Sequence, residues 1–288
     1  MSPKEVMGDI HQKPRECLKK DVRAMLLHAR TSVGSRERQM RASELAKMFE
    51  LEDTYWWFVG RRELVRELLL RAVPRLSTLD SRLSILDIGC GTGATLKALA
   101  DLGLVIGIDR SPEALRLCRQ RGLRELVLAD AEALPVASGS VDVVLALDLL
   151  EHIAADAAGV REFARVLKPG GLLLVTVPAI PWLWSAHDEA LDHLRRYRAK
   201  RLRRILVEAG FRIERLSPVI TTMLLPIAAL RLVQRLLPRK HGAPETAFII
   251  PPRAINWVLT ALLRLERVWL RCLNLPVGVS LFAVARRR

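Results

Sequence analysis

The chain has 288 residues, half of them hydrophobic, which excludes an intrinsically disordered protein and leaves room for one large or two small domains. Its four cysteines lack the paired spacing of a disulfide framework or a zinc site, so we expect no metal and a reducing, cytoplasmic location. The net charge of +15 lies in the C-terminal third, because the chain from Arg195 onward contains 20 Lys and Arg but only four Glu and no Asp. This asymmetry indicates an anionic partner such as a membrane surface, a phosphorylated substrate or nucleic acid.

The first 83 residues precede a regular alternation of strands and helices. Residues 1–45 are charged and poor in aromatic side chains, and we expect a basic extension without a clear helix boundary. They contain no apolar run of the length found in a secretory signal peptide. Residues 46–83 have helical periodicity, so we expect them to cover the core with two helices, the second beginning near Arg61 and ending before Pro74.

Short apolar runs alternate with helical segments across residues 84–217. Near-continuous apolar strands separated by helices are typical of a doubly wound parallel sheet, which is covered on both faces. Residues 218–278 interrupt the alternation with an apolar and basic helical pattern. Residues 279–288 then supply a last strand and a basic tail, so we expect the insertion to precede the last strand of the sheet.

The segment "ILDIGCGTGATL" joins the first strand to a helix through a glycine-rich turn. Gly89, Gly91 and Ala94 satisfy the G-x-G-x-x-(G/A) pattern of dinucleotide sites. Asp109 follows the first of these glycines by 20 residues, where a ribose-binding acid belongs, so a nicotinamide-dependent oxidoreductase is one interpretation. Asp87 argues against it, because a carboxylate beside the turn suits a cationic ligand better than a pyrophosphate.

Three later segments extend this pattern. "LADAEALPVASGSVDVV" places Asp130 after the third strand, where its carboxylate can accept a hydrogen bond from an adenine amino group. "LDLLEHI" and "VLKPGGLLLVTVP" follow at the fourth and fifth strands. Together with the glycine turn, these segments strongly resemble class I S-adenosylmethionine-dependent methyltransferases of the ubiquinone/menaquinone-biosynthesis-like (type 11/12) subgroup, over residues 50–217.

The resemblance implies an α/β fold, a doubly wound seven-stranded Rossmann-like sheet with its last strand antiparallel, and S-adenosylmethionine as the cofactor. The cofactor-binding residues that it implies are Gly89, Cys90, Gly91 and Gly93 under the methionine part, Asp87 near its ammonium group, Asp109 and Arg110 at the ribose, Asp130 and Ala131 at the adenine, and Asp148 and Leu149 beside the sulfonium.

The segment "YWWFVGRREL", residues 55–64, resembles an element that precedes the core in bacterial methyltransferases of this kind. By that analogy Trp56, Trp57 and Arg61 cover the cofactor, and the arginine could pair with the methionine carboxylate. The alternative is an aromatic-rich helix that only docks on the core.

The residues directly after the fourth strand indicate the kind of acceptor. Methyltransferases that act on nucleobase or glutamine nitrogen typically carry (D/N)-P-P-(Y/F) there, whereas this chain reads Asp-Leu-Leu-Glu-His from Asp148. We therefore expect methylation of oxygen or carbon in a small, apolar or lipid-linked acceptor, which the insertion and its arginines, such as Arg231 and Arg235, would hold. A nicotinamide-dependent oxidoreductase and a nucleic-acid-directed methyltransferase remain the alternatives, although no nucleic-acid-binding module is recognisable.

Histidines and arginines are the candidates for work on the acceptor. His152, His187 and His193 are the candidate bases, with His152 and His193 preferred, because an imidazole can take a hydroxyl proton near neutral pH; the alternative for His152 is a structural role. His193, Arg195, Arg196 and Tyr197 follow the fifth strand and could form a polar substrate wall; the alternative is the solvated start of a helix.

The insertion contains a helical pattern from Arg253 to Pro276. One predicted face carries Ile255, Val258, Leu259, Leu262, Trp269 and Leu273, and the opposite face carries Arg253, Arg264, Arg267 and Arg271. Glu266 falls on the apolar side, which predicts a buried partner or a role in a pocket. Such a helix can lie on an anionic membrane surface, at the cytoplasmic face of the inner membrane, or close the active site with its apolar face inward, or form a dimer interface. The sequence does not fix the oligomeric state.

Overall fold

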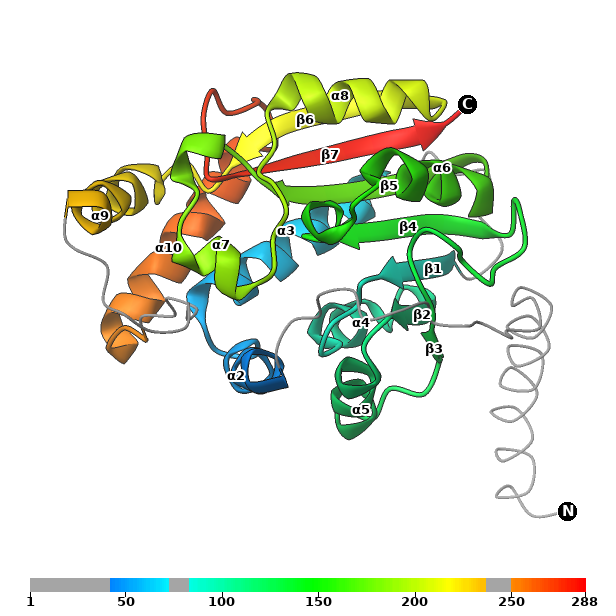
Figure 1. Cartoon of the computed structure of the whole chain (residues 1–288), viewed down its shortest axis with the longest axis horizontal. Helices are drawn as coiled ribbons and strands as arrows, with labels where there is room; N and C mark the ends of the chain where they lie inside the picture. Colours follow the sequence, from blue (N-terminus) through cyan, green and yellow to red (C-terminus); the bar gives the residue numbers. More distant parts are fainter. Residues whose placement is uncertain (1–41, 73–82, 237–249) are drawn as a thin grey trace, which may run out of the picture.

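The computed structural model describes residues 42–72, 83–236 and 250–288 (Figure 1). Most of the predicted N-terminal extension, residues 1–45, lies outside the described residues. Its last residues belong to helix α2 (Ala42–Leu51), so the first helix begins slightly earlier than expected.

A seven-stranded sheet forms the centre of the fold. Its strands are β1 (Leu83–Ile88), β2 (Gly103–Asp109), β3 (Leu126–Leu128), β4 (Val141–Leu147), β5 (Leu167–Pro178), β6 (Phe211–Val219) and β7 (Ser280–Arg287). In space they follow the order β3-β2-β1-β4-β5-β7-β6, and β7 is antiparallel to both of its neighbours. The predicted doubly wound sheet with an antiparallel last strand is confirmed.

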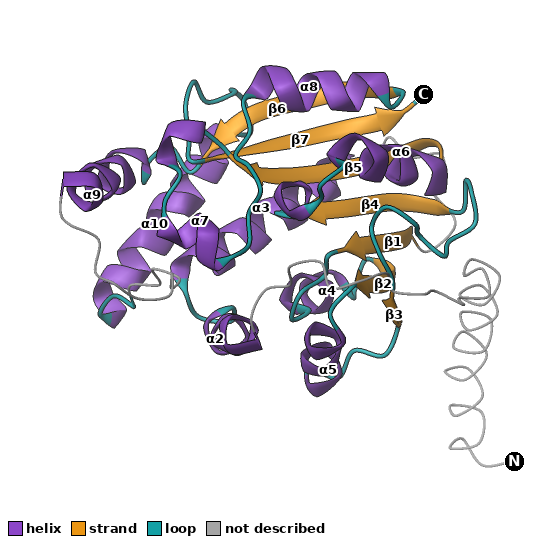
Figure 2. Cartoon of the chain, in the orientation of Figure 1, coloured by secondary structure: helices purple, strands orange, loops and turns teal. Residues whose placement is uncertain are grey.

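Helices cover both faces of this sheet (Figure 2). After α2, the described helices are α3 (Trp56–Ala72), α4 (Ala94–Leu99), α5 (Pro112–Gln120), α6 (Asp156–Val166), α7 (Ala186–Ala190), α8 (Ala199–Glu208), α9 (Leu224–Leu236) and α10 (Arg253–Trp269), with 3-10 turns at Leu150–His152 and Pro181–Leu183. Alternate residues of β4 face opposite layers: Val144 packs in the core with α6 and α8, and Val143 packs in the core with α3 and α10. Burial on both faces explains why the strands are apolar throughout.

Helix α3 begins at Trp56, and the predicted start near Arg61 is wrong. The backbone N–H of Trp56 donates a 3.0 Å hydrogen bond to Oδ1 of Asn256, and Nδ2 of the same asparagine donates to the carbonyl of Thr54 at 2.9 Å. A side chain from α10, 200 residues later, thus satisfies a free donor of the first turn of α3. Local sequence carries no trace of this cap.

Helix α10 packs along α3 through its charged edge. Arg264 and Arg267 pair with Glu63, and Arg267 and Arg271 pair with Glu67. The side chains predicted to share an apolar face are largely exposed: Ile255, Val258, Trp269 and Leu273 are all between 48% and 67% accessible. Leu259 and Leu262, predicted on the same face, are partly buried and pack against the core, so only part of this face is covered and both a lid and a surface-facing helix stay consistent with the structure. None of the described helices is both long and apolar enough to span a membrane.

Glu266 is buried between α10 and the segment that follows β6. Its carboxylate accepts hydrogen bonds from the backbone N–H of Ile220 and from both the backbone N–H and the hydroxyl of Thr222. The predicted buried partner of Glu266 is confirmed, and it ties α10 to the end of the sheet.

Candidate functional site

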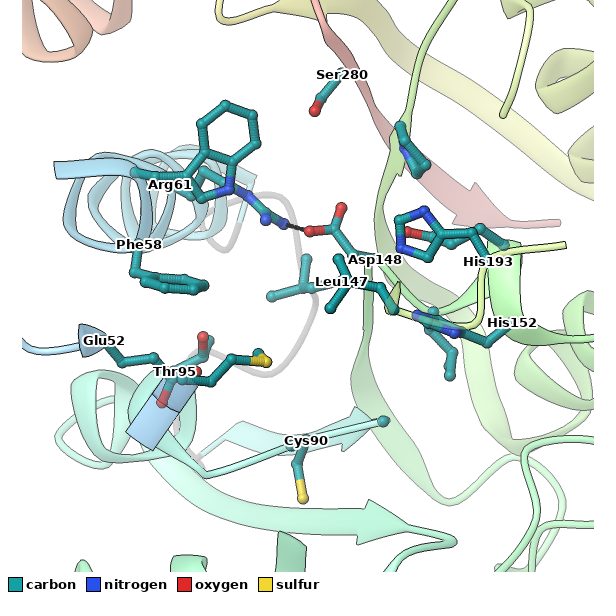
Figure 3. Close-up of a pocket in the computed structure, with 18 of the residues that line it drawn as sticks. Glu52, Phe58, Arg61, Cys90, Thr95, Leu147, Asp148, His152, His193 and Ser280 are labelled. Atoms are coloured by element: carbon teal, nitrogen blue, oxygen red, sulfur yellow. Dashed lines mark ion pairs between the residues drawn. The ribbon is translucent and has the colours of Figure 1, made fainter. Parts of the chain in front are cut away.

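A cavity of about 540 Å³ opens at the carboxyl ends of the parallel strands (Figure 3). The segments after β1, β2, β4 and β5 line it, and α2, α3, α7 and α9 contribute further side chains. The sheet order reverses between β1 and β4, and ligands of doubly wound sheets bind at such a reversal. The fold therefore places a binding site where the sequence motifs converge.

The glycine turn after β1 has a backbone that only glycine adopts easily. Gly89 and Gly91 have φ values of 71° and 54°, and the backbone N–H of Gly91 donates a 2.9 Å hydrogen bond to Oδ2 of Asp109. A Cβ at Gly89 would lie 2.7 Å from Leu149, whereas one at Gly91 would meet nothing within 4 Å. Both glycines and Cys90 line the cavity, and Gly93 caps α4 next to them. The turn can therefore approach a ligand closely.

The cavity wall around this turn is acidic. Burial, together with the nearby Asp109 and Glu52, raises the pKa of Asp87 to about 8. Burial also raises the pKa of Asp109, although this carboxylate accepts hydrogen bonds from the backbone of Gly91 and Ser111. Arg110, Asp130 and Ala131 also line the cavity. A positively charged ligand group placed here would favour ionised carboxylates. We call this side of the cavity the acidic half.

Arg61 and Asp148 form an ion pair across the middle of the cavity (Figure 3). Arg61 also donates a 3.1 Å hydrogen bond to the hydroxyl of Thr176 and lies 5.8 Å from the ring of Trp57. Asp148 has a φ of 50°, a conformation that non-glycine residues rarely adopt and that is often found at functional sites. Trp56, Arg61, Asp148 and Leu149 all line the cavity.

Histidines line the side of the cavity opposite Glu52 and Phe58 (Figure 3). The rings of His152 and His193 are 4.9 Å apart, and Nδ1 of His193 lies 3.0 Å from a carboxylate oxygen of Asp188. Burial, followed by the neighbouring His193, lowers the pKa of His152 to about 4. The imidazole of His152 is therefore neutral at pH 7 and can accept a proton.

Two members of the predicted substrate wall, His193 and Arg196, line the cavity. Arg196 lies there, where it pairs with Asp188 at 2.8 Å. Tyr197 is fully buried, and its hydroxyl donates to the carbonyl of Leu150 and to Asp156, so its predicted contact with substrate is wrong. The structure also contradicts this role for Arg195, whose guanidinium binds backbone carbonyls and Asp156 outside the cavity. The backbone of Tyr197 pairs with the end of β5, and this pairing turns the side chain into the core.

Several lining residues were not predicted individually from the sequence. Glu52 on the segment after α2 accepts from Thr92, Glu151 is fully buried, and Arg231 comes from α9 of the insertion. Neither carboxylate oxygen of Glu151 has a hydrogen-bond partner among the described residues, and burial raises its pKa well above the usual range. The only sequence feature that could have indicated Glu151 as a site residue is its position next to His152. The other two lie on helical segments whose orientation is set by packing.

One cluster among the described residues could hold a metal ion. Ligand atoms of Glu151, His152 and His193 all lie within 4.8 Å of one another. The sequence predicted no metal. A direct metal-binding measurement on this cluster would test that prediction. The same three groups could equally act on protons, because two are imidazoles and one is a buried carboxyl.

Comparisons with known proteins point to one family. Residues 86–175 match a family model described as a methyltransferase domain. The chain is 37% identical over 136 residues to the tRNA (carboxymethyluridine(34)-5-O)-methyltransferase of Mus musculus, covering 46% of this chain and 19% of that protein. It is 33% identical over 166 residues to a "Probable S-adenosylmethionine-dependent methyltransferase" of Mycobacterium tuberculosis, covering 56% and 58%. It is 34% identical over 146 residues to the ubiquinone biosynthesis O-methyltransferase of Xanthomonas oryzae pv. oryzae, covering 46% and 60%.

The fold has relatives among solved structures. A complex between the Haloferax volcanii Trm112 methyltransferase activator and a methyltransferase contains a similar chain, with a TM-score of 0.55, 19% identity, and coverage of 87% of this chain and 99% of that one. This likeness shows the Rossmann-like fold. The sequence matches span 19% to 60% of the length of the three relatives named above.

Proposed function

Because the chain carries a class I S-adenosylmethionine-dependent methyltransferase domain, we propose that it transfers the methyl group of that cofactor to an oxygen or carbon of a small, apolar or lipid-linked acceptor. The single observation that carries the proposal is the glycine turn held to Asp109 at the reversal of the sheet. The O-methyltransferase relative and the Asp-Leu-Leu-Glu-His sequence after β4 support oxygen or carbon as the methylated atom. A nicotinamide-dependent oxidoreductase has no comparable support.

The acidic half fits S-adenosylmethionine. The open space above Gly91 would admit the methionine part, and Asp87 would face its ammonium group. Asp109 would accept hydrogen bonds from the ribose hydroxyls, and Asp130 with Ala131 would receive the adenine. Arg61 would exchange its contact with Asp148 for the methionine carboxylate. Carboxylates gathered around a cationic cofactor provide the charge complementarity that a pyrophosphate would lack.

The residues on the other side of the cavity would serve the acceptor. When bound, the cofactor supplies an electrophilic methyl group for an in-line displacement. An imidazole nitrogen of the neutral His152 would accept the proton of an acceptor hydroxyl. Asp188 orients His193, whose ring packs edge-on against His152 and fixes its position.

Calorimetric titration tests the cofactor assignment. We expect S-adenosylhomocysteine to bind and NAD not to bind under the same conditions. Mass spectrometry of lipid and soluble extracts, after a labelled methyl donor is supplied with and without the protein, would then identify the acceptor. Binding of NAD without binding of S-adenosylhomocysteine would refute the proposal.

Asp109→Ala should weaken the binding of S-adenosylhomocysteine by at least about tenfold. The substitution removes an acceptor for the ribose hydroxyls and frees the backbone N–H of Gly91, and a hydrogen bond to a charged group contributes about 1.5–3 kcal/mol. Calorimetry measures the change, and Asp101→Ala, which removes an exposed carboxylate paired with Arg66, is the matched control. Unchanged affinity in a folded Asp109→Ala protein would reject the ribose contact.

The exposed face of α10 supports docking on an anionic membrane surface. We define the α10 outer face as Ile255, Trp257, Val258, Leu265, Val268, Trp269 and Leu273, each at least 45% accessible. Arg253 at the start of α10 is exposed, and the chain has a net charge of +15. Apolar and tryptophan side chains with an exposed arginine beside them in sequence suit the interface of an anionic bilayer. A lipid-linked acceptor would be reached from there.

Vesicle co-sedimentation measures this docking. We expect binding to phosphatidylglycerol-containing vesicles to exceed binding to phosphatidylcholine vesicles, and the double variant Trp257→Ser/Trp269→Ser to lose most of the bound fraction. Val207→Ser removes an exposed apolar side chain from α8 and should bind like the wild type. A dimer in sedimentation equilibrium that the double variant dissociates would instead make the α10 outer face a subunit interface.

A nucleic-acid acceptor is the second candidate, because one relative is named for its action on tRNA. Many arginines of the basic third are paired within the protein: Arg264 with Glu63, Arg271 with Glu67. Arg286 likewise pairs with Glu214. Such pairs reduce the charge available for phosphates, which favours the small acceptor. Salt-dependent retention on tRNA stronger than on anionic vesicles would reverse this preference.

A further inference from the structure

Arg231 on α9 is a buried guanidinium that faces the cavity. Its side chain is 7% accessible, it lines the cavity, and its Nε has no hydrogen-bond partner among the described residues. Its one hydrogen bond within that part of the chain runs from a terminal nitrogen to Oε1 of Gln234 at 2.8 Å. A buried charge without a direct ion pair is costly, and the described residues provide none for Arg231, so its position indicates a binding partner that enters from the cavity.

The nearest carboxylate is already used. Asp188 pairs with Arg196 at 2.8 Å and with His193 at 3.0 Å, and it accepts a hydrogen bond from the backbone of Ser185. Burial, followed by the charge of Arg231, lowers the pKa of His187 to about 4, so this imidazole adds no charge at pH 7. Two guanidiniums thus share one carboxylate, and we call this region the basic half.

The two halves of the cavity differ in their ionisable groups: carboxyl groups predominate in one and guanidinium groups in the other. Glu52, Asp87, Asp109 and Asp130 line the acidic half, and Arg196 and Arg231 line the basic half. A cationic donor and an anionic acceptor would each find a complementary wall.

We propose that Arg231, with Arg196 beside it, binds a carboxylate or phosphate group of the acceptor, so that the substrate is an apolar molecule with an anionic group. This inference rests on the proposed function and adds the chemical class of its acceptor. A guanidinium fork binds either anion through two parallel hydrogen bonds. The insertion that carries α9 therefore supplies the residue that selects the acceptor.

Calorimetry on the protein saturated with S-adenosylhomocysteine tests the inference with three probes of equal chain length: octyl phosphate, octanoate and 1-octanol. We expect at least one anionic probe to bind ten times or more tightly than 1-octanol, and the better anion identifies the group. Arg231→Gln should abolish this preference and leave the affinities for 1-octanol and S-adenosylhomocysteine unchanged. Arg235→Gln is the control, because it removes an exposed guanidinium from the same helix.

Thermal denaturation provides a second readout. Without an anion, Arg231→Gln should melt no lower than the wild type, because it removes an uncompensated charge. The preferred anionic probe should raise the melting temperature of the wild type only. Arg231→Lys, which keeps the charge and loses the fork, should retain part of the preference. Equal affinity of the wild type for all three probes, or an equal loss for all three in Arg231→Gln, would overturn the inference. Failure of S-adenosylhomocysteine to bind would instead refute the proposed function.

Discussion

Replacing His152 by Gln should lower kcat for methyl transfer by about 10²–10⁴-fold and leave the affinity for S-adenosylhomocysteine unchanged. The imidazole lies in the cavity beside His193, and its low pKa keeps it unprotonated at neutral pH. Glutamine keeps a polar side chain of similar length without a basic nitrogen. Initial rates of S-adenosylhomocysteine release, with an extract that supports turnover, measure the effect. Ser280→Ala, a substitution of another polar side chain that lines the cavity, is the control.

The pH profile separates a base from a structural histidine. A base with a pKa of about 4 is active above that value, so the wild-type rate should rise near pH 4 and stay level between pH 6 and pH 8. The Gln variant should lack this rise. Because the folded state resists a proton that the unfolded chain accepts below about pH 6.5, His152 makes the fold less stable as the pH falls from 6.5 toward 4. Circular dichroism must therefore confirm folding at each pH. A kcat within threefold of wild type would exclude His152 as the base.

The sheet could be predicted from sequence because its signals are local. Each strand is a short apolar run, and each helix between strands has its own period and boundary; Ser111, for instance, caps α5 as a helix N-cap should. The start of α3 was predicted wrongly because the side chain that caps it belongs to Asn256, which lies 200 residues away in the sequence. The division of the predicted face of α10, with Leu259 and Leu262 covered and Trp269 exposed, could not be predicted for the same kind of reason. A helical pattern separates apolar from charged positions, and Glu63 and Glu67 on α3 decide which side is covered.

The residues of the candidate site likewise fall into those that local sequence predicts and those that only packing places. Asp87, Asp109 and Asp148 could be predicted because they end parallel strands or follow them directly, and all such ends meet at one edge of a sheet. The arginines of the insertion could be expected to hold the acceptor, but the choice of Arg231 among them could not be predicted, because its helix lies in an insertion whose placement depends on packing. The role of Tyr197 was predicted wrongly because a tyrosine between arginines is typical of a polar surface. Its ring and hydroxyl are instead buried in the core.

Glu266→Ala should lower the free energy of unfolding by about 3 kcal/mol, because it leaves buried donors without an acceptor. The backbone N–H groups of Ile220 and Thr222 both bind this carboxylate, and Glu266 itself is 5% accessible. For a chain of this size, each kcal/mol corresponds to about 2–4 °C in Tm, so we expect a loss of roughly 10 °C.

Glu266→Gln separates the hydrogen bonds from the packing of the side chain. Its amide oxygen can still accept from one of the two N–H groups, so its Tm should lie between those of the wild type and Glu266→Ala. Glu208→Ala, at an exposed position on α8, should change the Tm by less than about 2 °C. Because Ile220 and Thr222 follow β6 and lead into α9, which carries Arg231, Glu266→Ala should also weaken binding of the anionic probe. A Tm equal to that of the wild type would mean that water or another group replaces the carboxylate.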